Sequence, residues 1–132
     1  YATDASLYQI MPTIVVVPRD EADIIAAVEI ARQFELPVTA RGGGTSLSGQ
    51  TYGSGMILDV SKYHHRILEV DTAQGWARVQ SGAVRDVVNS QLAKHGVHFA
   101  PDPATGSRAT IGGMIGNNTC GTRSILYGKS ID

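Results

Sequence analysis

The chain has 132 residues, of which 42% are hydrophobic and 17% are charged, and its formal net charge is −1. These values exclude intrinsic disorder, which requires low hydrophobicity with high net charge, and they speak against nucleic-acid binding through bulk charge, which requires a basic excess. No apolar run approaches the roughly 20 residues of a membrane span. The one cysteine, Cys120, excludes an internal disulfide, and the chain fits a reducing cytoplasm.

The first half of the chain predicts a βαβ unit. Residues 14–17 are a short β-branched run that predicts a buried strand, and Asp20 is suited to cap a helix that ends near Phe34. Two further strands are predicted at residues 38–40 and 56–60. Because strand, helix and strand follow one another closely, the first two strands are expected to form a parallel pair with a right-handed crossover.

The second half predicts an antiparallel hairpin followed by helices. In chain order, the pattern indicates strands at 67–70 and 76–80, a helix at 84–94 that ends at Gly96, a strand at 97–100 and a helix start at 109–112. The predicted fold class is therefore α+β. We assign residues 13–60 to a βαβ subdomain and residues 61–132 to the start of a second α+β subdomain.

Glycine is the unusual feature of the composition, with 15 residues that cluster at 42–55 and 106–128. The first cluster follows the predicted strand 38–40, at the carboxyl end where open α/β sheets bind ligands. Successive glycines can turn several N–H groups toward one point, which is typical of an anion nest, and the neighbouring hydroxyls add donors. This pattern predicts a phosphate- or pyrophosphate-binding loop made by Arg41, Gly42, Gly43, Gly44, Thr45, Ser46, Gly49 and Gln50.

Two familiar phosphate motifs do not account for this loop. Residues 44–51 come close to a Walker A loop, but Gln50 stands where that motif requires lysine, so an NTPase is disfavoured. A Rossmann fingerprint fails because Leu47 replaces its third glycine and because a strand follows rather than a helix. A flexible surface loop without a ligand is the alternative for the first cluster taken alone.

The second cluster opens a predicted helix with small residues. Free N–H groups at a helix start attract anions, and asparagine amides can hydrogen-bond the polar edges of a ring system. The candidate residues are Thr110, Gly112, Gly113, Gly116, Asn117 and Asn118. Together the two clusters could hold opposite sides of one long ligand, such as a dinucleotide cofactor. Close helix packing through glycine is the alternative, and it is compatible with binding.

A rigid turn with proline on both sides of one carboxylate lies before the second cluster. We expect Pro101 and Asp102 to shape the wall of the ligand site, with a simple strand-ending turn as the alternative. His64 and His65 are adjacent, so their side chains would point apart on a strand and rarely bind one metal. The sequence assigns no catalytic base and no metal ligand.

These motifs occur together in a known family. The chain resembles the N-terminal FAD-binding domain of FAD-linked oxidases of the vanillyl-alcohol oxidase and p-cresol methylhydroxylase (PCMH) type. Within that family it is most similar to the D-2-hydroxyacid dehydrogenases, which include the glycolate oxidase FAD subunit, D-lactate dehydrogenase and flavin–iron–sulfur fusion proteins. The resemblance covers essentially the whole chain and is carried by Pro37, residues 41–46, Gly49, Gln50, and residues 101–103, 110–113 and 121–128.

The resemblance implies a small βαβ subdomain and a larger antiparallel α+β subdomain, with FAD between them. It implies that the Gly42–Gly49 loop wraps the FAD pyrophosphate, and that the Thr110–Asn118 segment and Gly121 line the other side of the cofactor. Covalent relatives carry a histidine or a cysteine where this chain has Thr45 and Ala109, so non-covalent FAD is expected. The domain of that family continues further, so the chain is expected to be a truncated domain without the catalytic residues.

The function implied by the resemblance is oxidation of a D-2-hydroxyacid to the 2-oxoacid by hydride transfer to FAD. The substrate would belong to the lactate, glycolate or 2-hydroxyglutarate class, and the full-length protein would pass electrons to an acceptor. A cytoplasmic location is expected; peripheral contact with a membrane and iron–sulfur clusters elsewhere in the full-length protein are left open. A non-catalytic nucleotide- or phosphate-binding module is the alternative. Alone, the chain is expected to be inactive, to bind FAD weakly and to self-associate.

Overall fold

The computed structural model describes all residues from 1 to 132, which divide into two compact units, Tyr1–His64 and His65–Asp132. Each unit has its own hydrophobic cluster and its own sheet. We therefore describe each by itself. No helix in the structure combines the length and the apolar composition needed to cross a membrane.

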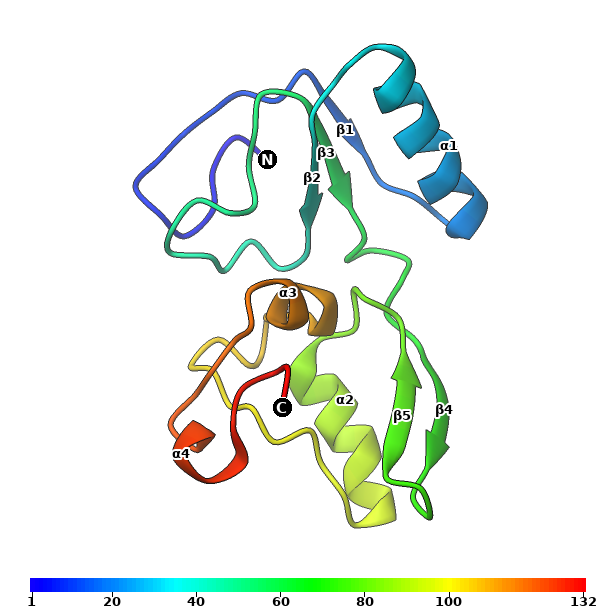
Figure 1. The fold of residues 1–132 in the computed structure, drawn as a ribbon, viewed down its shortest axis with the longest axis vertical. Coiled ribbons are helices and arrows are strands. Elements are labelled where there is room, and N and C mark those ends of the chain that lie inside the picture. The colour runs from blue at the N-terminus through cyan, green and yellow to red at the C-terminus, as the bar shows by residue number, and fades with distance from the viewer. The chain divides into compact units, whose positions relative to one another are not determined.

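The first unit contains a three-stranded parallel sheet and one helix (Figure 1). Its elements are β1 (Ile14–Val16), α1 (Glu21–Gln33), β2 (Val38–Arg41) and β3 (Met56–Asp59). The strand order is β1-β3-β2, so β3 pairs with both other strands and separates them. The prediction that the first two strands pair directly is therefore wrong, although both are parallel to their shared neighbour.

Burial explains the strand order. All four residues of β3 are buried, as the central strand of a sheet covered by a helix requires. In contrast, Ile14 at the start of β1 is 44% exposed and the rest of that strand is half-buried, so the prediction of a buried first strand is wrong. Three consecutive residues of β3, Met56, Ile57 and Leu58, are apolar and buried, and burial of such a run from water favours the central position.

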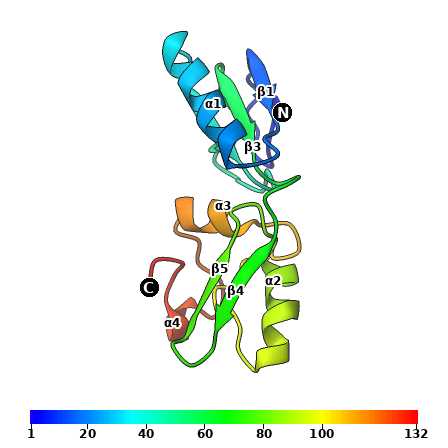
Figure 2. The ribbon, with the colours of Figure 1, turned by 90° about the vertical axis from the view of Figure 1, so that its right-hand side faces the viewer.

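Helix α1 covers the sheet through two small residues. Ala27 and Ala31 pack against Met56 and Leu58 of β3, and Figure 2 shows the helix lying along the sheet. The carboxylate of Asp20 accepts a hydrogen bond from the N–H of Asp23 at 3.0 Å, which confirms the predicted N-cap. The helix leads into β2, whose carboxyl end is followed by the glycine loop.

The second unit pairs a β-hairpin with a helix. Its elements are β4 (Ile67–Asp71), β5 (Trp76–Val79), α2 (Arg85–Leu92), the 3-10 helix η1 (Ala93–His95), α3 (Ile111–Gly116) and α4 (Ser124–Tyr127). The predicted antiparallel hairpin is confirmed, and Figure 2 shows α2 beside it. Val88 and Leu92 of α2 join Ala83 and Ile111 in the core of this unit.

The end of the α2 region is confirmed, but the next predicted element is absent. Gly96 follows η1 with a φ of 72°, the left-handed conformation that glycine adopts most easily at a helix end. Residues 97–100 form no strand. Instead, the side chain of Asn89 on α2 accepts from the N–H of Phe99 at 2.7 Å and donates to its carbonyl at 3.0 Å. A side chain thus satisfies the main chain that a neighbouring strand would have paired.

The hairpin β4–β5 pairs with no further strand of the chain. Beside it lies an apolar cavity of about 700 Å³, whose lining includes Trp76, Val79, Leu92, Phe99 and Ile111. Unpaired strand edges next to apolar surface favour association with another chain. The hairpin therefore explains why self-association is expected of the 132-residue chain alone.

We expect the 132-residue chain to form concentration-dependent oligomers, measured by light scattering during size-exclusion chromatography. Trp76→Lys places a charge on the side of β5 that lines the cavity and should shift the chain toward monomer. Leu68→Lys is the matched control, because Leu68 is a 53% exposed residue of β4 that does not line the cavity. Equal effects of the two variants, or a monomer at every concentration, would contradict this expectation.

Candidate functional site

The first glycine cluster lies where predicted, directly after the carboxyl end of β2. None of the main-chain N–H groups from Gly42 to Ser46 donates a hydrogen bond to an acceptor within the chain. Main-chain donors left without a protein partner need water or a ligand, and a run of them on one tight loop suits the oxygens of a phosphate. The arrangement therefore fits the pyrophosphate group of a dinucleotide.

The loop is held in shape by its own residues. The hydroxyl of Ser46 donates to Oε1 of Gln50 and accepts from the N–H groups of Ser48 at 3.2 Å and Gln50 at 3.4 Å. In this arrangement the Ser46 hydroxyl helps to close the loop, and its contact with a cofactor stays a prediction. Gly44 and Gly49 have φ values of 64° and 75°, which side chains with a Cβ rarely adopt.

Arg41 ends β2, and one nitrogen of its guanidinium is bound to the main chain. Its Nη1 atom donates to the main-chain carbonyls of Thr3 at 2.9 Å and Thr51 at 3.1 Å. Both acceptors belong to this unit, so Arg41 joins the two ends of the glycine loop to the N-terminal residues. Sequence reasoning had assigned this side chain to the cofactor.

The second glycine cluster differs from its prediction in one important respect. The first N–H groups of α3 are all used within the chain: Ile111 donates to the carbonyl of Ala83 at 2.8 Å, Gly112 to that of Ser81 at 2.8 Å, and Gly113 to the hydroxyl of Thr110 at 3.4 Å. The expectation that this helix start offers free donors to an anion is therefore wrong. Any ligand contact here must come from other groups of the segment.

The glycines of α3 serve two different purposes. A Cβ on Gly112 would lie 2.7 Å from Cβ of Ser81 and 2.9 Å from its carbonyl oxygen, so this glycine permits close packing, as the alternative interpretation stated. Gly113 and Gly116 are exposed, and a Cβ on Gly116 would meet no atom within 4 Å. Packing within the chain therefore does not explain Gly116, and the bare main chain at 113–116 is open to a ligand.

The two asparagines after α3 close this segment. Asn117 is the C-cap of the helix, and its N–H donates to the carbonyl of Gly113 at 3.0 Å. Asn118 has a φ of 45°, and its side-chain oxygen accepts from the N–H of Ile131 at 3.2 Å. Asn118 thus ties the end of α3 to the last residues of the chain.

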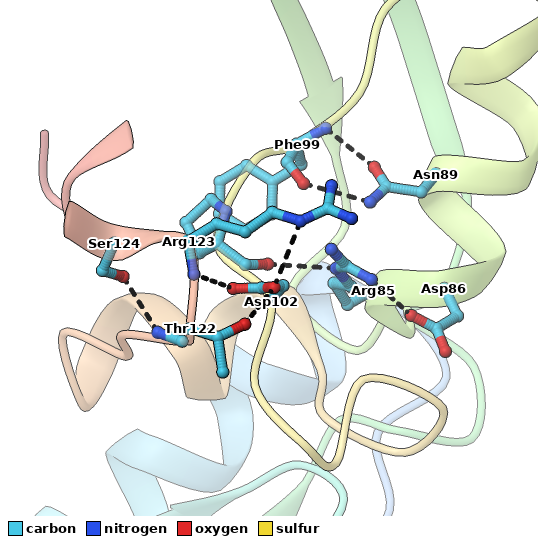
Figure 3. A network of polar contacts seen from close by, with 10 residues as sticks. Arg85, Asp86, Asn89, Phe99, Asp102, Thr122, Arg123 and Ser124 are labelled. Carbon is cyan, nitrogen blue, oxygen red and sulfur yellow. Dashed lines mark hydrogen bonds and ion pairs between the residues drawn. The ribbon is translucent and has the colours of Figure 1, made fainter. Parts of the chain in front are cut away.

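The turn at Pro101–Pro103 is fastened through its carboxylate, as Figure 3 shows. Asp102 accepts from the hydroxyl of Thr122 and from the N–H of Arg123, both at 2.9 Å, and forms an ion pair with the Arg123 guanidinium at 3.5 Å. Gly121 packs directly against Asp102, where no Cβ would fit. The structure therefore brings two predicted site residues, Asp102 and Gly121, into contact.

Helix α2 holds the other side of the same turn. Nε of Arg85 donates to the carbonyl of the buried Pro101 at 3.0 Å, while its Nη1 pairs with Asp86 at 2.9 Å (Figure 3). Sequence reasoning missed Arg85 as a support of this turn. The signal was weak, because an arginine on the first turn of an amphipathic helix ordinarily faces water.

The contacts of Asp102 predict a pH-dependent stability. The hydrogen bond from the Arg123 N–H is the main cause of a lowered pKa for Asp102; partial burial opposes it, and the Thr122 hydroxyl and the Arg123 charge reinforce it. Because the folded-state pKa lies below the unfolded one, the stabilisation is complete above an ordinary carboxyl pKa of about 4 and is lost as the pH falls through the folded-state value.

We therefore expect Asp102→Asn to lower the urea midpoint of unfolding at neutral pH and to have a shrinking effect as the solution becomes acidic. Circular dichroism of both proteins across a pH series measures this. Glu29→Gln, which alters an exposed carboxylate on α1 that forms no ion pair, is the control. A difference between Asp102→Asn and the unaltered protein that stays constant down to low pH would contradict the assigned contacts.

Comparison with known proteins now identifies the family. Residues 12–132 match the FAD binding domain family. D-2-hydroxyglutarate dehydrogenase of Escherichia coli is 42% identical over 134 residues, which cover 99% of this chain and 13% of that protein. Glycolate oxidase subunit GlcD of Bacillus subtilis is 35% identical over 136 residues, which cover 100% of this chain and 28% of that protein. The chain thus spans a small part of the curated relatives that it matches.

The fold has a solved counterpart. An alkyldihydroxyacetonephosphate synthase structure matches with a TM-score of 0.77 at 24% sequence identity, covering 87% of this chain and 22% of that protein. At this identity the match concerns the fold, which is the PCMH type that the sequence resemblance implied. With the sequence match over almost the whole chain and the free N–H groups of the first glycine loop, the conclusion is that this chain belongs to the FAD binding domain family.

Proposed function

We propose that the chain is the FAD-binding segment of a flavoprotein that oxidises a D-2-hydroxyacid to the 2-oxoacid. One observation carries the cofactor assignment: the N–H groups of residues 42–46 have no acceptor within the chain. The similarity to D-2-hydroxyglutarate dehydrogenases at 42% identity favours the 2-hydroxyglutarate class over lactate and glycolate. Bound FAD would supply the acceptor for the hydride from the substrate.

The residues of this chain bind and orient the cofactor in this proposal. The loop from Gly42 to Gly49 holds the pyrophosphate through its free N–H groups. The segment from Thr110 to Asn118 contributes open main chain at Gly113 and Gly116, while Gly112 packs against Ser81 and Thr110 caps the start of α3. Pro101, Asp102 and Gly121 belong to the turn that the Asp102 hydrogen bonds hold together. We assign no residue of the chain to proton or hydride transfer.

We propose the following substrate, electron acceptor and location for the full-length protein. The 2-hydroxyacid and an electron acceptor are partners of the full-length protein, and its catalytic residues lie outside the 132 residues. We propose a cytoplasmic location. The boundaries 13–60 and 61–132 remain our division of the chain into a pyrophosphate-loop subdomain and the start of a second subdomain.

The experiment that tests this function is purification of the full-length protein and its visible absorption spectrum. We expect a flavin spectrum that bleaches under anaerobic conditions with D-2-hydroxyglutarate, and less readily with D-lactate or glycolate. A colourless protein that binds inorganic phosphate would instead support the alternative of a non-catalytic phosphate-binding module, because the free N–H groups recognise phosphate whatever molecule carries it. A flavin spectrum that no 2-hydroxyacid bleaches would refute the substrate class.

We further expect the FAD to be held without a covalent bond. Thr45 lacks a nucleophilic ring nitrogen, and Ala109, which is 6% exposed, has no reactive atom. Acid precipitation of the full-length protein should release all of the flavin into the supernatant. Yellow colour that stays with the washed pellet would show a covalent link and contradict the prediction.

A further inference from the structure

The N-terminal residues lie against both ends of the glycine loop. Residues 1–10 close on themselves, because the N–H of Ile10 donates to the carbonyl of Ala2 at 2.9 Å and Thr3 forms a β-bridge with Gln9. We call this closed segment the N-terminal clasp. Three side chains, those of Arg41, Asp4 and Tyr1, make its polar contacts with the rest of the first unit, and the Tyr8 ring lies 6.5 Å from the Tyr52 ring.

Arg41 is the first of these contacts. Its Nη1 atom donates to the carbonyl of Thr3 in the clasp and to the carbonyl of Thr51 at the far end of the glycine loop, at 2.9 Å and 3.1 Å. One guanidinium nitrogen thus joins the clasp to both ends of the loop, since Arg41 itself precedes Gly42. Both acceptors are main-chain carbonyls of the first unit, so these bonds require no ligand atom.

Asp4 and Tyr1 make the other two contacts. Oδ2 of Asp4 accepts from the hydroxyl of Thr51 at 3.2 Å, while Oδ1 accepts from the N–H of Ser6 at 2.8 Å. The hydroxyl of Tyr1 donates at 2.8 Å to Asp59, which is only 7% exposed at the end of β3, and its ring lies 5.4 Å below the Arg41 guanidinium. The clasp is therefore anchored to β2, to β3 and to the end of the loop.

The glycine loop between these anchors is rich in residues with high conformational freedom, so holding its two ends affects how tightly it can bind a ligand. A run of glycines loses more conformational freedom on ordering than any other sequence, and a loop that must be ordered by its ligand binds that ligand more weakly. The free N–H groups of 42–46 can act together only when the chain holds them in one arrangement. Fixing both ends of the loop before binding removes part of that entropic cost.

We propose that the N-terminal clasp preorganises the glycine loop for its anion and that Arg41, through its Nη1 atom, acts as a positioning residue. The inference deepens the proposed function and rests on it. Arg41→Met keeps the length of the side chain and removes both hydrogen bonds, Arg41→Lys restores one point donor, and Arg19→Gln is a surface control. The guanidinium of Arg19 makes no hydrogen bond or ion pair with the chain.

Two measurements on the full-length protein test the proposal. Hydrogen–deuterium exchange of the FAD-free protein reports on residues 1–10 and 42–51, and flavin fluorescence reports on the dissociation constant for FAD. In Arg41→Met we expect faster exchange in both segments and an affinity loss of tenfold or more, since two charge-assisted bonds are removed. Arg41→Lys should recover part of both, and Arg19→Gln should change neither.

A second variant separates the clasp from the loop itself. Asp4→Ala removes the hydrogen bond between the clasp and the hydroxyl of Thr51. We expect it to weaken FAD binding, although Asp4 lies far from the glycine loop in the sequence. Because both residues hold the same segment, Asp4→Ala with Arg41→Met should cost less than the product of the single effects. Full additivity of the two would contradict a shared clasp.

The possible outcomes separate failure of the clasp proposal from failure of the proposed FAD-binding function. Weaker FAD binding in Arg41→Met with unchanged exchange would show a direct ligand contact and overturn the positioning role. Faster exchange with unchanged affinity would overturn preorganisation. If the unaltered protein holds no flavin, the proposed function fails, and unchanged exchange in Arg41→Met would then reject the clasp independently.

Discussion

Gly43→Asp should abolish retention of FAD by the full-length protein while leaving it folded. Gly43 is exposed in the middle of the loop whose N–H groups have no acceptor in the chain, so a side chain there meets the ligand rather than the core. A carboxylate at this point would face the phosphate oxygens with like charge and would lose its water. We expect the dissociation constant to rise at least about 100-fold, or roughly 2.7 kcal/mol.

The matched control is Gly43→Asn, which has nearly the same size and no charge. It should weaken binding less than Gly43→Asp, because only the steric part of the effect remains. Flavin fluorescence titration measures both dissociation constants, and circular dichroism confirms that both variants are folded. Near-normal flavin content in the folded Gly43→Asp variant would show that the loop does not bind the cofactor.

Gly55→Ala should destabilise the first unit by about 3 kcal/mol, although it adds a single methyl group. The added carbon would overlap the carbonyl oxygen of Pro37 and lie 2.7 Å from its Cγ atom. That carbonyl accepts from the N–H of Met56 at 2.8 Å, and Gly55 accepts from the N–H of Thr13 at 2.9 Å. Neither neighbour can move away without breaking a bond at the start of the sheet.

Gly116→Ala is the same chemical change at a place where the new carbon meets nothing within 4 Å. Because alanine favours helix over glycine by up to about 1 kcal/mol, this control should leave stability unchanged or slightly raised. Urea unfolding followed by circular dichroism compares the two variants. A midpoint for Gly55→Ala equal to that of Gly116→Ala would show that the contact with Pro37 relaxes easily.

Local signals along the chain predicted most of the elements. The cap at Asp20, the glycine at 96 and the alternation in the hairpin each depend on a few neighbouring residues, and each is confirmed. The errors arise where distant residues compete. The apolar run at 97–100 looked like a strand, but its main chain bonds the side chain of Asn89 instead, which no local pattern reveals.

The same distinction explains the candidate site. The first glycine loop was predicted from its composition and its place after a strand, and the N–H groups of its residues 42–46 have no acceptor within the chain. The second helix start looked equally free, yet the carbonyls of Ser81 and Ala83, some thirty positions earlier, take its donors. Whether a donor is available to a ligand is a question of tertiary hydrogen bonds, so sequence alone answers it only for loops that close on themselves.

The order of the strands in the first unit has a consequence for how that unit folds. β3 is the last of the three strands in the sequence and the central one in space, and β1 shares no pairing with β2. No partial sheet can therefore form from β1, α1 and β2 alone; the chain between β2 and β3 must first close and bring β3 into place. Closure of the glycine loop is thus a step of folding itself, and a variant that slows this closure would slow refolding of the whole unit.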